Sequence, residues 1–163
     1  MRERRIEFIL PIVILILDQV TKAIVKAKLP IYASTIAIPG LVDFTHVPNS
    51  GIAYGLLQNV NFPFKTVIIA MIAAAAMVGV GVYAAGLAHH QRIARVGLSL
   101  IIGGAAGNLI DRLVSGSVVD FIDVYWHTHH FWVFNVADSA ISIGVTVMIL
   151  DMLGLGAHVS KTV

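Results

Sequence analysis

Long apolar stretches constrain the fold of this chain more than any other feature of its sequence. Four of them approach the roughly 20 residues that a helix needs to cross a bilayer, at residues 8–27, 67–88, 96–113 and 131–150. Only 12% of the residues are charged, against roughly 25% in soluble proteins. The sequence therefore predicts an all-α, polytopic membrane protein with four transmembrane helices, forming one domain over residues 1–163.

The basic residues predict how these spans are oriented. An even number of spans places both termini on one side, and that side carries most of the cations: Arg2, Arg4, Arg5, Arg92, Arg95 and Lys161. The opposite loops, residues 29–64 and 114–130, contain no Lys or Arg, so the positive-inside rule predicts cytoplasmic termini. Four cations at span ends can snorkel and therefore count for less in this rule: Lys26, Lys28, Lys65 and Arg112.

A net charge of +2 without a basic stripe does not favour nucleic-acid binding.

The first outer loop has the pattern of a short hairpin. Residues 34–38 and 42–47 are rich in β-branched and apolar types and flank the turn Pro39-Gly40. We expect a small extracytoplasmic β-hairpin or sheet between helices 1 and 2. A turn of small residues, 49–55, follows and would allow another backbone to approach closely. Residues 114–130 are expected to form the second outer loop.

Ionisable groups inside apolar spans are costly, which makes them functional candidates. Asp18 and Lys22 lie four residues apart on one helix face and can neutralise each other, which favours a structural ion pair. Asn108, Asp111 and Arg112 share a face at the outer end of the third span. With the predicted orientation, all five residues gather towards the outer leaflet.

Two further carboxyl groups belong to the same leaflet. Asp138 is the only ionisable residue in 131–150 and has Asn135 one turn before it, whereas Asp120 lies among apolar residues in the second outer loop. If the two approach, they would share one proton, so that one carboxylate activates water while its partner donates a hydrogen bond. Spacing alone leaves open that Asp120 is an exposed loop acid.

Other features of the sequence favour structural roles. Gly103 and Gly107 form a small-residue pair typical of helix packing. The chain has no cysteine, which excludes disulfides and thiolate chemistry. Its run from His127 to His130 lacks a metal-ligand pattern and lies beside Trp126 and Trp132, as in an interfacial aromatic belt. We therefore expect no metal and no cofactor.

Five blocks of sequence together resemble a known family. They are DQVTK at 18–22, NSGIAYG at 49–55, GAAGNLIDR at 104–112, VVDF at 118–121 and FNVADS at 134–139. In this order the chain resembles the lipoprotein signal peptidases, also called signal peptidase II. The resemblance implies an intramembrane aspartic endopeptidase that cuts signal peptides from bacterial prolipoproteins, before a diacylglyceryl-modified cysteine.

The resemblance also implies roles for individual residues. It makes Asp120 and Asp138 the catalytic pair. It places five residues around the site, Asn49, Gly51, Asn108, Arg112 and Asn135, and three in its structural support, Asp18, Lys22 and Asp111. Tyr54 stands where Phe is expected more often. The expected protein is a cofactor-free monomer of the bacterial inner membrane, with its active site near the outer face and with diacylated prolipoproteins and membrane lipid as its partners.

The residues alone leave two other functions open. Intramembrane Asp and Lys side chains also mark proton-coupled transporters, although the chain lacks a visible inverted repeat. A serine-lysine peptidase could use Ser50 or Ser139 with Lys22.

Overall fold

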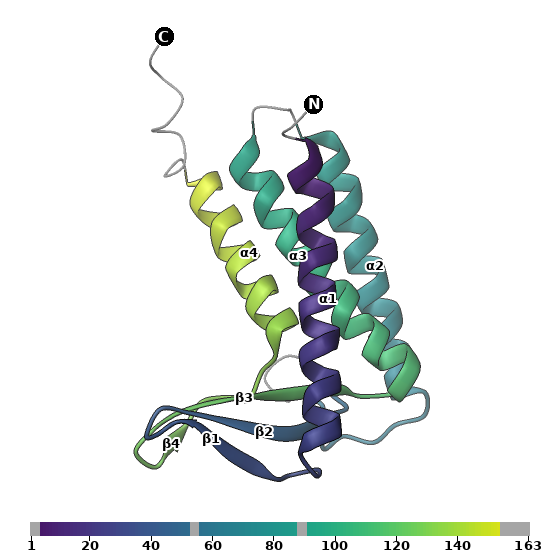
Figure 1. Ribbon diagram of the computed structural model, residues 1–163. Helices are drawn as coiled ribbons and strands as arrows, with labels where there is room; N and C mark the ends of the chain where they lie inside the picture. The colour runs from purple at the N-terminus through teal and green to yellow at the C-terminus, as the bar shows by residue number, and fades with distance from the viewer. Residues whose placement is uncertain (1–3, 53–55, 88–90, 154–163) are drawn as a thin grey trace.

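A computed structural model of the chain describes residues 4–52, 56–87 and 91–153. Arg2, Tyr54 and Lys161, named above, lie outside these ranges. The described elements follow in the order α1 (Arg4–Lys28), β1 (Ser34–Ile38), β2 (Val42–Asn49), α2 (Lys65–Gly86), α3 (Arg92–Ser115), β3 (Val118–Trp126), β4 (His129–His130) and α4 (Val136–Met152). The helices run side by side as a bundle, and the sheet lies across the end of the bundle at which α1 finishes and α4 begins (Figure 1).

The helices agree with the predicted spans except at the start of the fourth. Three are long and apolar enough to cross a membrane: Phe8–Lys28, Lys65–Gly86 and Arg92–Ser115. The fourth helix, α4, begins at Val136 rather than at residue 131 and is 17 residues long. Phe131 and Phe134 instead donate backbone hydrogen bonds to Val124 and Ile122 of β3, at 2.8 and 3.1 Å. That α4 also crosses the bilayer stays a prediction.

The sheet is antiparallel and contains more strands than the sequence indicated. Its order is β1-β2-β3-β4, so the predicted hairpin between helices 1 and 2 is present as β1 and β2. The segment 114–130, expected as the second outer loop, contains two further strands, β3 and β4. Strand β3 pairs with β2 from Val42↔Val124 to Asn49↔Val118, which buries its first four residues. Asp120 is consequently a buried strand residue, 5% exposed, and not an exposed loop acid.

Helix α3 is the centre of the bundle and contacts the other three helices. Glycines permit this close packing. A Cβ on Gly103 would lie 2.8 Å from the Pro11 carbonyl oxygen of α1, and one on Gly107 would collide with the Asp18 carboxylate. Gly97 of α3 faces Gly144 of α4 in the same way. The prediction that Gly103 and Gly107 serve helix packing is confirmed.

Adding a methyl group at this interface should destabilise the bundle. In Gly104→Ala the new Cβ would collide with the Ala137 carbonyl oxygen and lie 2.9 Å from Ile141, so we expect the free energy of unfolding to fall by about 1–3 kcal/mol. Gly79→Ala in α2 is the matched control, because nothing lies within 4 Å of its Cβ position. Unfolding in mixed micelles checks both variants, and equal effects would contradict the packing described here.

Candidate active site

A buried cluster of charges lies beneath the site. The Lys22 Nζ is 2.7 Å from Asp18 Oδ2, 2.8 Å from Asp111 Oδ2 and 2.9 Å from Asn108 Oδ1. Asp18 and Lys22 are 0% and 1% exposed, so the predicted ion pair is formed away from solvent. Charges buried this deeply persist only when they are paired and hydrogen-bonded. We call these four residues the Lys22 cluster.

The Lys22 cluster joins three helices. Asp18 of α1 also accepts a 2.9 Å hydrogen bond from the backbone N–H of Ala137, in the first turn of α4. Gln19 donates to the Gly107 carbonyl and to Asp111 of α3, at 3.2 and 3.4 Å. The start of α4 is thereby fixed against α1 and α3, which determines where the side chains of its first turn lie.

Asn135 connects the two candidate catalytic carboxyl groups. It is the N-cap of α4, where its Oδ1 accepts from the Asp138 N–H at 2.9 Å and its own N–H donates to Asp138 Oδ2 at 3.3 Å. Its Nδ2 donates to Asp120 Oδ1 at 2.8 Å. One fully buried residue therefore contacts both Asp120 and Asp138.

Amide groups hold the remaining oxygens of this pair. Asn49, at the end of β2, donates to Asp120 Oδ2 at 2.8 Å, and Asn108 donates to Asp138 Oδ1 at 2.8 Å. Because the Asn108 Oδ1 accepts from Lys22, its amide can present only N–H groups to Asp138. Burial and the negative charge of Asp138 raise the pKa of Asp120 from 3.8 to about 7. At neutral pH the two carboxyl groups therefore favour sharing a proton.

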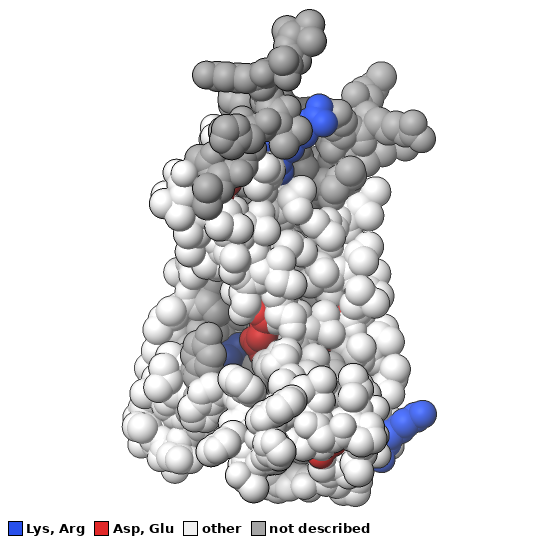
Figure 2. All heavy atoms as spheres, turned by 90° about the vertical axis from the view of Figure 1, so that its left-hand side faces the viewer, with Lys and Arg blue, Asp and Glu red and all other residues white. Residues whose placement is uncertain are grey.

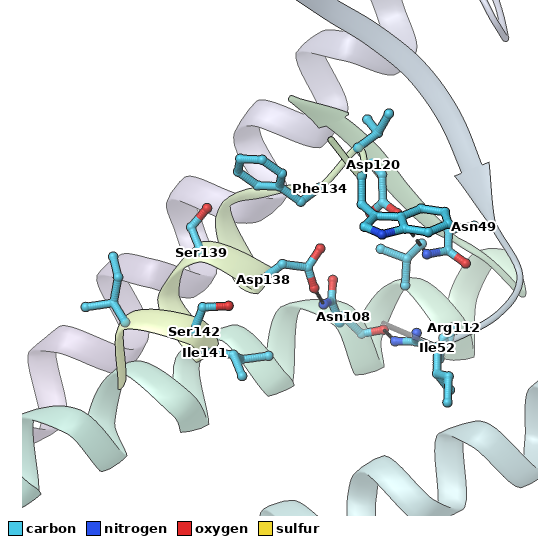
Figure 3. Close-up of a pocket in the computed structure, with 14 residues that line it drawn as sticks. Asn49, Ile52, Asn108, Arg112, Asp120, Phe134, Asp138, Ser139, Ile141 and Ser142 are labelled. Atoms are coloured by element: carbon cyan, nitrogen blue, oxygen red, sulfur yellow. Dashed lines mark hydrogen bonds between the residues drawn. The ribbon is translucent and has the colours of Figure 1, made fainter. Parts of the chain in front are cut away.

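Both carboxyl groups line one cavity of about 390 Å³. Figure 3 shows them directed into the same space, Asp120 from β3 and Asp138 from α4. A second cavity, of about 310 Å³ and bounded by α2, α3 and α4, shares Ile52, Asn108, Arg112, Asp138 and Ile141 with the first. The walls of both are otherwise mostly apolar. Figure 2 shows a hollow in which acidic and basic atoms are visible, and the surface around this hollow is largely uncharged.

Arg112 and Gly51 complete the rim of the site. Arg112 lines both cavities and donates to the carbonyls of Asn108 and Gly51 at 3.1 and 2.9 Å. The Gly51 N–H donates to Asn49 Oδ1 at 2.8 Å. A Cβ on Gly51 would collide with the Leu56 carbonyl oxygen, so a larger residue does not fit.

The structure brings all ten predicted site residues together, and it adds others. Ile52, Trp132 and Phe134 also line the cavity; Ile52 and Phe134 lie within the family-like blocks, but no site role was expected for any of the three. Lys65 is buried instead of snorkelling, as described below. The histidine run lies apart from the cavity, where His130 pairs with Asp123 at 2.9 Å on the exposed β3-β4 hairpin.

Comparison with known proteins identifies the family. A sequence model described as signal peptidase (SPase) II matches residues 10–154. The chain belongs to the signal peptidase II family. It is 44% identical over 149 residues to the lipoprotein signal peptidase of Geobacter metallireducens, covering 91% of each chain. The lipoprotein signal peptidase of Pseudomonas aeruginosa is 37% identical, covering 86% of this chain and 83% of that one.

Solved structures agree with this assignment to signal peptidase II. One described as a bacterial membrane enzyme superposes with a TM-score of 0.83 at 30% identity, covering 96% of this chain and 93% of the other. A second with the same description gives a TM-score of 0.81 at 31% identity, covering 96% and 94%. As a signal peptidase II family member the protein is a membrane protease, and the site described above is where its cleavage chemistry is expected.

The raised pKa of Asp120 predicts a measurable pH dependence. The folded state favours the protonated acid, so the free energy of unfolding should fall by a few kcal/mol as pH rises from about 4 to about 7. Infrared spectroscopy should show a protonated carboxyl band that titrates near pH 7 and is lost in Asp120→Asn. A band that titrates near pH 4 would contradict the burial of Asp120.

Proposed function

We propose that this member of the signal peptidase II family is an aspartic endopeptidase. It removes signal peptides from diacylglyceryl-modified prolipoproteins by cutting before the lipidated cysteine. The observation that supports the mechanism best is the joint position of Asp120 and Asp138. Both line one cavity, both are hydrogen-bonded to Asn135, and the oxygens not bound by Asn135 receive N–H groups from Asn49 and Asn108.

In the proposed reaction a water molecule between the two carboxyl groups attacks the scissile carbonyl carbon. The ionised carboxylate accepts the proton of that water, and the protonated partner donates a hydrogen bond to the carbonyl oxygen as negative charge develops there. The intermediate then collapses as the C–N bond breaks, and the carboxyl group that accepted the water proton passes it to the leaving amine. The three asparagine amides keep the carboxyl groups oriented, so little reorganisation is needed during the reaction. No covalent bond forms between the enzyme and the substrate at any step.

The shape and polarity of the site suit a substrate that is partly dissolved in lipid. The two apolar cavities meet at Asp138, and both are bounded by helices that carry exposed apolar residues on their outer surfaces. A signal helix and two acyl chains could therefore reach the carboxyl groups from the bilayer. We expect the protein to act as a monomer that needs lipid but no cofactor.

A serine-lysine mechanism has less support. The Lys22 ammonium is already bound by Asp18, Asp111 and Asn108, so it is not available as a base. The Ser139 hydroxyl donates to the Asn135 carbonyl at 2.9 Å within its own helix. A transporter is also disfavoured: among the described residues, the buried charged groups lie in the second half of α1, at the first residue of α2, near the end of α3 and in β3, and none lies in the other half of any of these helices.

Replacing either carboxyl group should abolish cleavage. With purified protein and a diacylated prolipoprotein, we expect Asp120→Asn and Asp138→Asn to lower kcat by at least about a thousandfold, because each loses its proton transfer or its hydrogen bond to the carbonyl. Ser139→Ala should keep most of the activity. Full activity in either aspartate variant, or its loss only in Ser139→Ala, would exclude the proposed pair.

We also propose that the protein lies in the bacterial inner membrane with both termini in the cytoplasm and its site near the outer face. Charge asymmetry supports this orientation: between Leu29 and Phe64, and between Val114 and His130, there is no Lys or Arg. Reporter fusions at Asn59 and Leu87 should report the outside and the inside, respectively. Reversed signals would place the site on the cytoplasmic face.

A further inference from the structure

A second buried lysine lies at the outer end of α2. Lys65 is the first residue of this helix and is only 8% exposed. Its Nζ donates to the Ser50 hydroxyl at 3.3 Å and to the Gln58 carbonyl at 3.0 Å. Among the residues that the structure describes, its hydrogen-bond acceptors are both neutral oxygens.

This position is unfavourable for a lysine unless its contacts are useful. An ammonium group at a helix N-terminus opposes the helix dipole, and burial adds a desolvation cost. A lysine at the end of a membrane span would normally extend its side chain to water. Lys65 instead points back to the two ends of segment 50–58, of which residues 50–52 and 56–58 are described.

The ends of segment 50–58 form part of the wall of the active site. Ile52 lines both cavities, and its N–H donates to the Leu56 carbonyl at 2.9 Å. The Gly51 carbonyl accepts from Arg112. A Cβ on Gly51 would lie 2.9 Å from the Gln58 nitrogen, so the two ends of the segment are in close contact where Lys65 joins them.

We propose that Lys65 is a positioning residue for substrate binding. By joining Ser50 to Gln58, it holds residues 50–52 against residues 56–58, so that Ile52 and Gly51 keep their places beside the cavities. The catalytic carboxyl groups belong to β3 and α4 and do not depend on this bond. Lys65 therefore acts on the binding of the substrate and not on the chemical step, an inference that rests on the function proposed above.

Steady-state kinetics test this separation of binding from chemistry. With the diacylated prolipoprotein, Lys65→Met should raise KM by about tenfold and change kcat by less than about threefold. Lys65→Arg should restore KM, because its guanidinium keeps donors for both oxygens. Lys28→Met is the matched control: it removes the same charge at the outer end of α1, where the side chain is exposed, and should leave both constants unchanged.

A spectroscopic measurement separates this role from a general loss of structure. The chain has no cysteine, so Leu56→Cys, at a side chain that is 59% exposed, accepts a single spin label. Lys65→Met should sharpen the label's spectrum, whereas Lys65→Arg and Lys28→Met should not. If Lys65→Met does not fold, Ser50→Ala removes one of the two contacts and should raise KM by about threefold at unchanged kcat.

Three results would overturn the inference: an unchanged KM in Lys65→Met, a loss confined to kcat, or no restoration by Lys65→Arg. Asp120→Asn is assayed in parallel to keep this inference distinct from the proposed mechanism. Activity that survives in Asp120→Asn would contradict the aspartic mechanism, but the KM comparison between Lys65 variants would still be valid. An unchanged KM in Lys65→Met would remove the role of Lys65 and leave the mechanism intact.

Discussion

The rest of the structure depends on the ammonium group of Lys22. It contacts two carboxylates and the Asn108 amide oxygen, at 2.7 to 2.9 Å, in a region that water does not reach. Loss of this ammonium group would leave two carboxylates without a counter-charge in a low dielectric, which costs several kcal/mol. The cluster therefore specifies one arrangement of α1 against α3. Through the bond from Asp18 to the Ala137 N–H, it also specifies where α4 begins.

The late start of α4 creates the space for the site. Phe131 and Phe134 use their backbone groups on β3, so the helix begins only at Val136 and the sheet lies across that end of the bundle (Figure 1). Asp120 enters this space from β3, and Asp138 enters from the first turn of α4. Asn135 stands at the junction, where one side chain serves as helix cap and as hydrogen-bond donor to Asp120. The hydrogen bonds of Asn135 that begin α4 therefore also position the two carboxyl groups of the site.

The sequence predicted the helices well because a membrane span needs a long apolar run, and such runs are local features. It predicted the Asp18 and Lys22 pair because helical spacing places the two side chains together. It did not predict β3, since alternation within VVDFIDVYW is incomplete and its pairing partner, β2, is about 75 residues away. The predicted start of the fourth helix was wrong, and the burial of Lys65 was not predicted, for a related reason. Both depend on contacts outside the helix itself, those of Phe131 and Phe134 with β3 and those of Lys65 with Ser50 and Gln58.

The contacts around the carboxyl pair explain why asparagines surround it. A cation bonded directly to Asp120 or Asp138 would stabilise the ionised form of that group, and two ionised carboxylates could not supply both a base and a hydrogen-bond donor. Asparagine amides orient the oxygens without adding charge. Lys22 contacts Asp138 only through Asn108, whose carbonyl binds the cation and whose N–H group faces the carboxylate. A neutral amide thus separates the structural cation from the proposed catalytic pair and leaves the two carboxyl groups one proton to share.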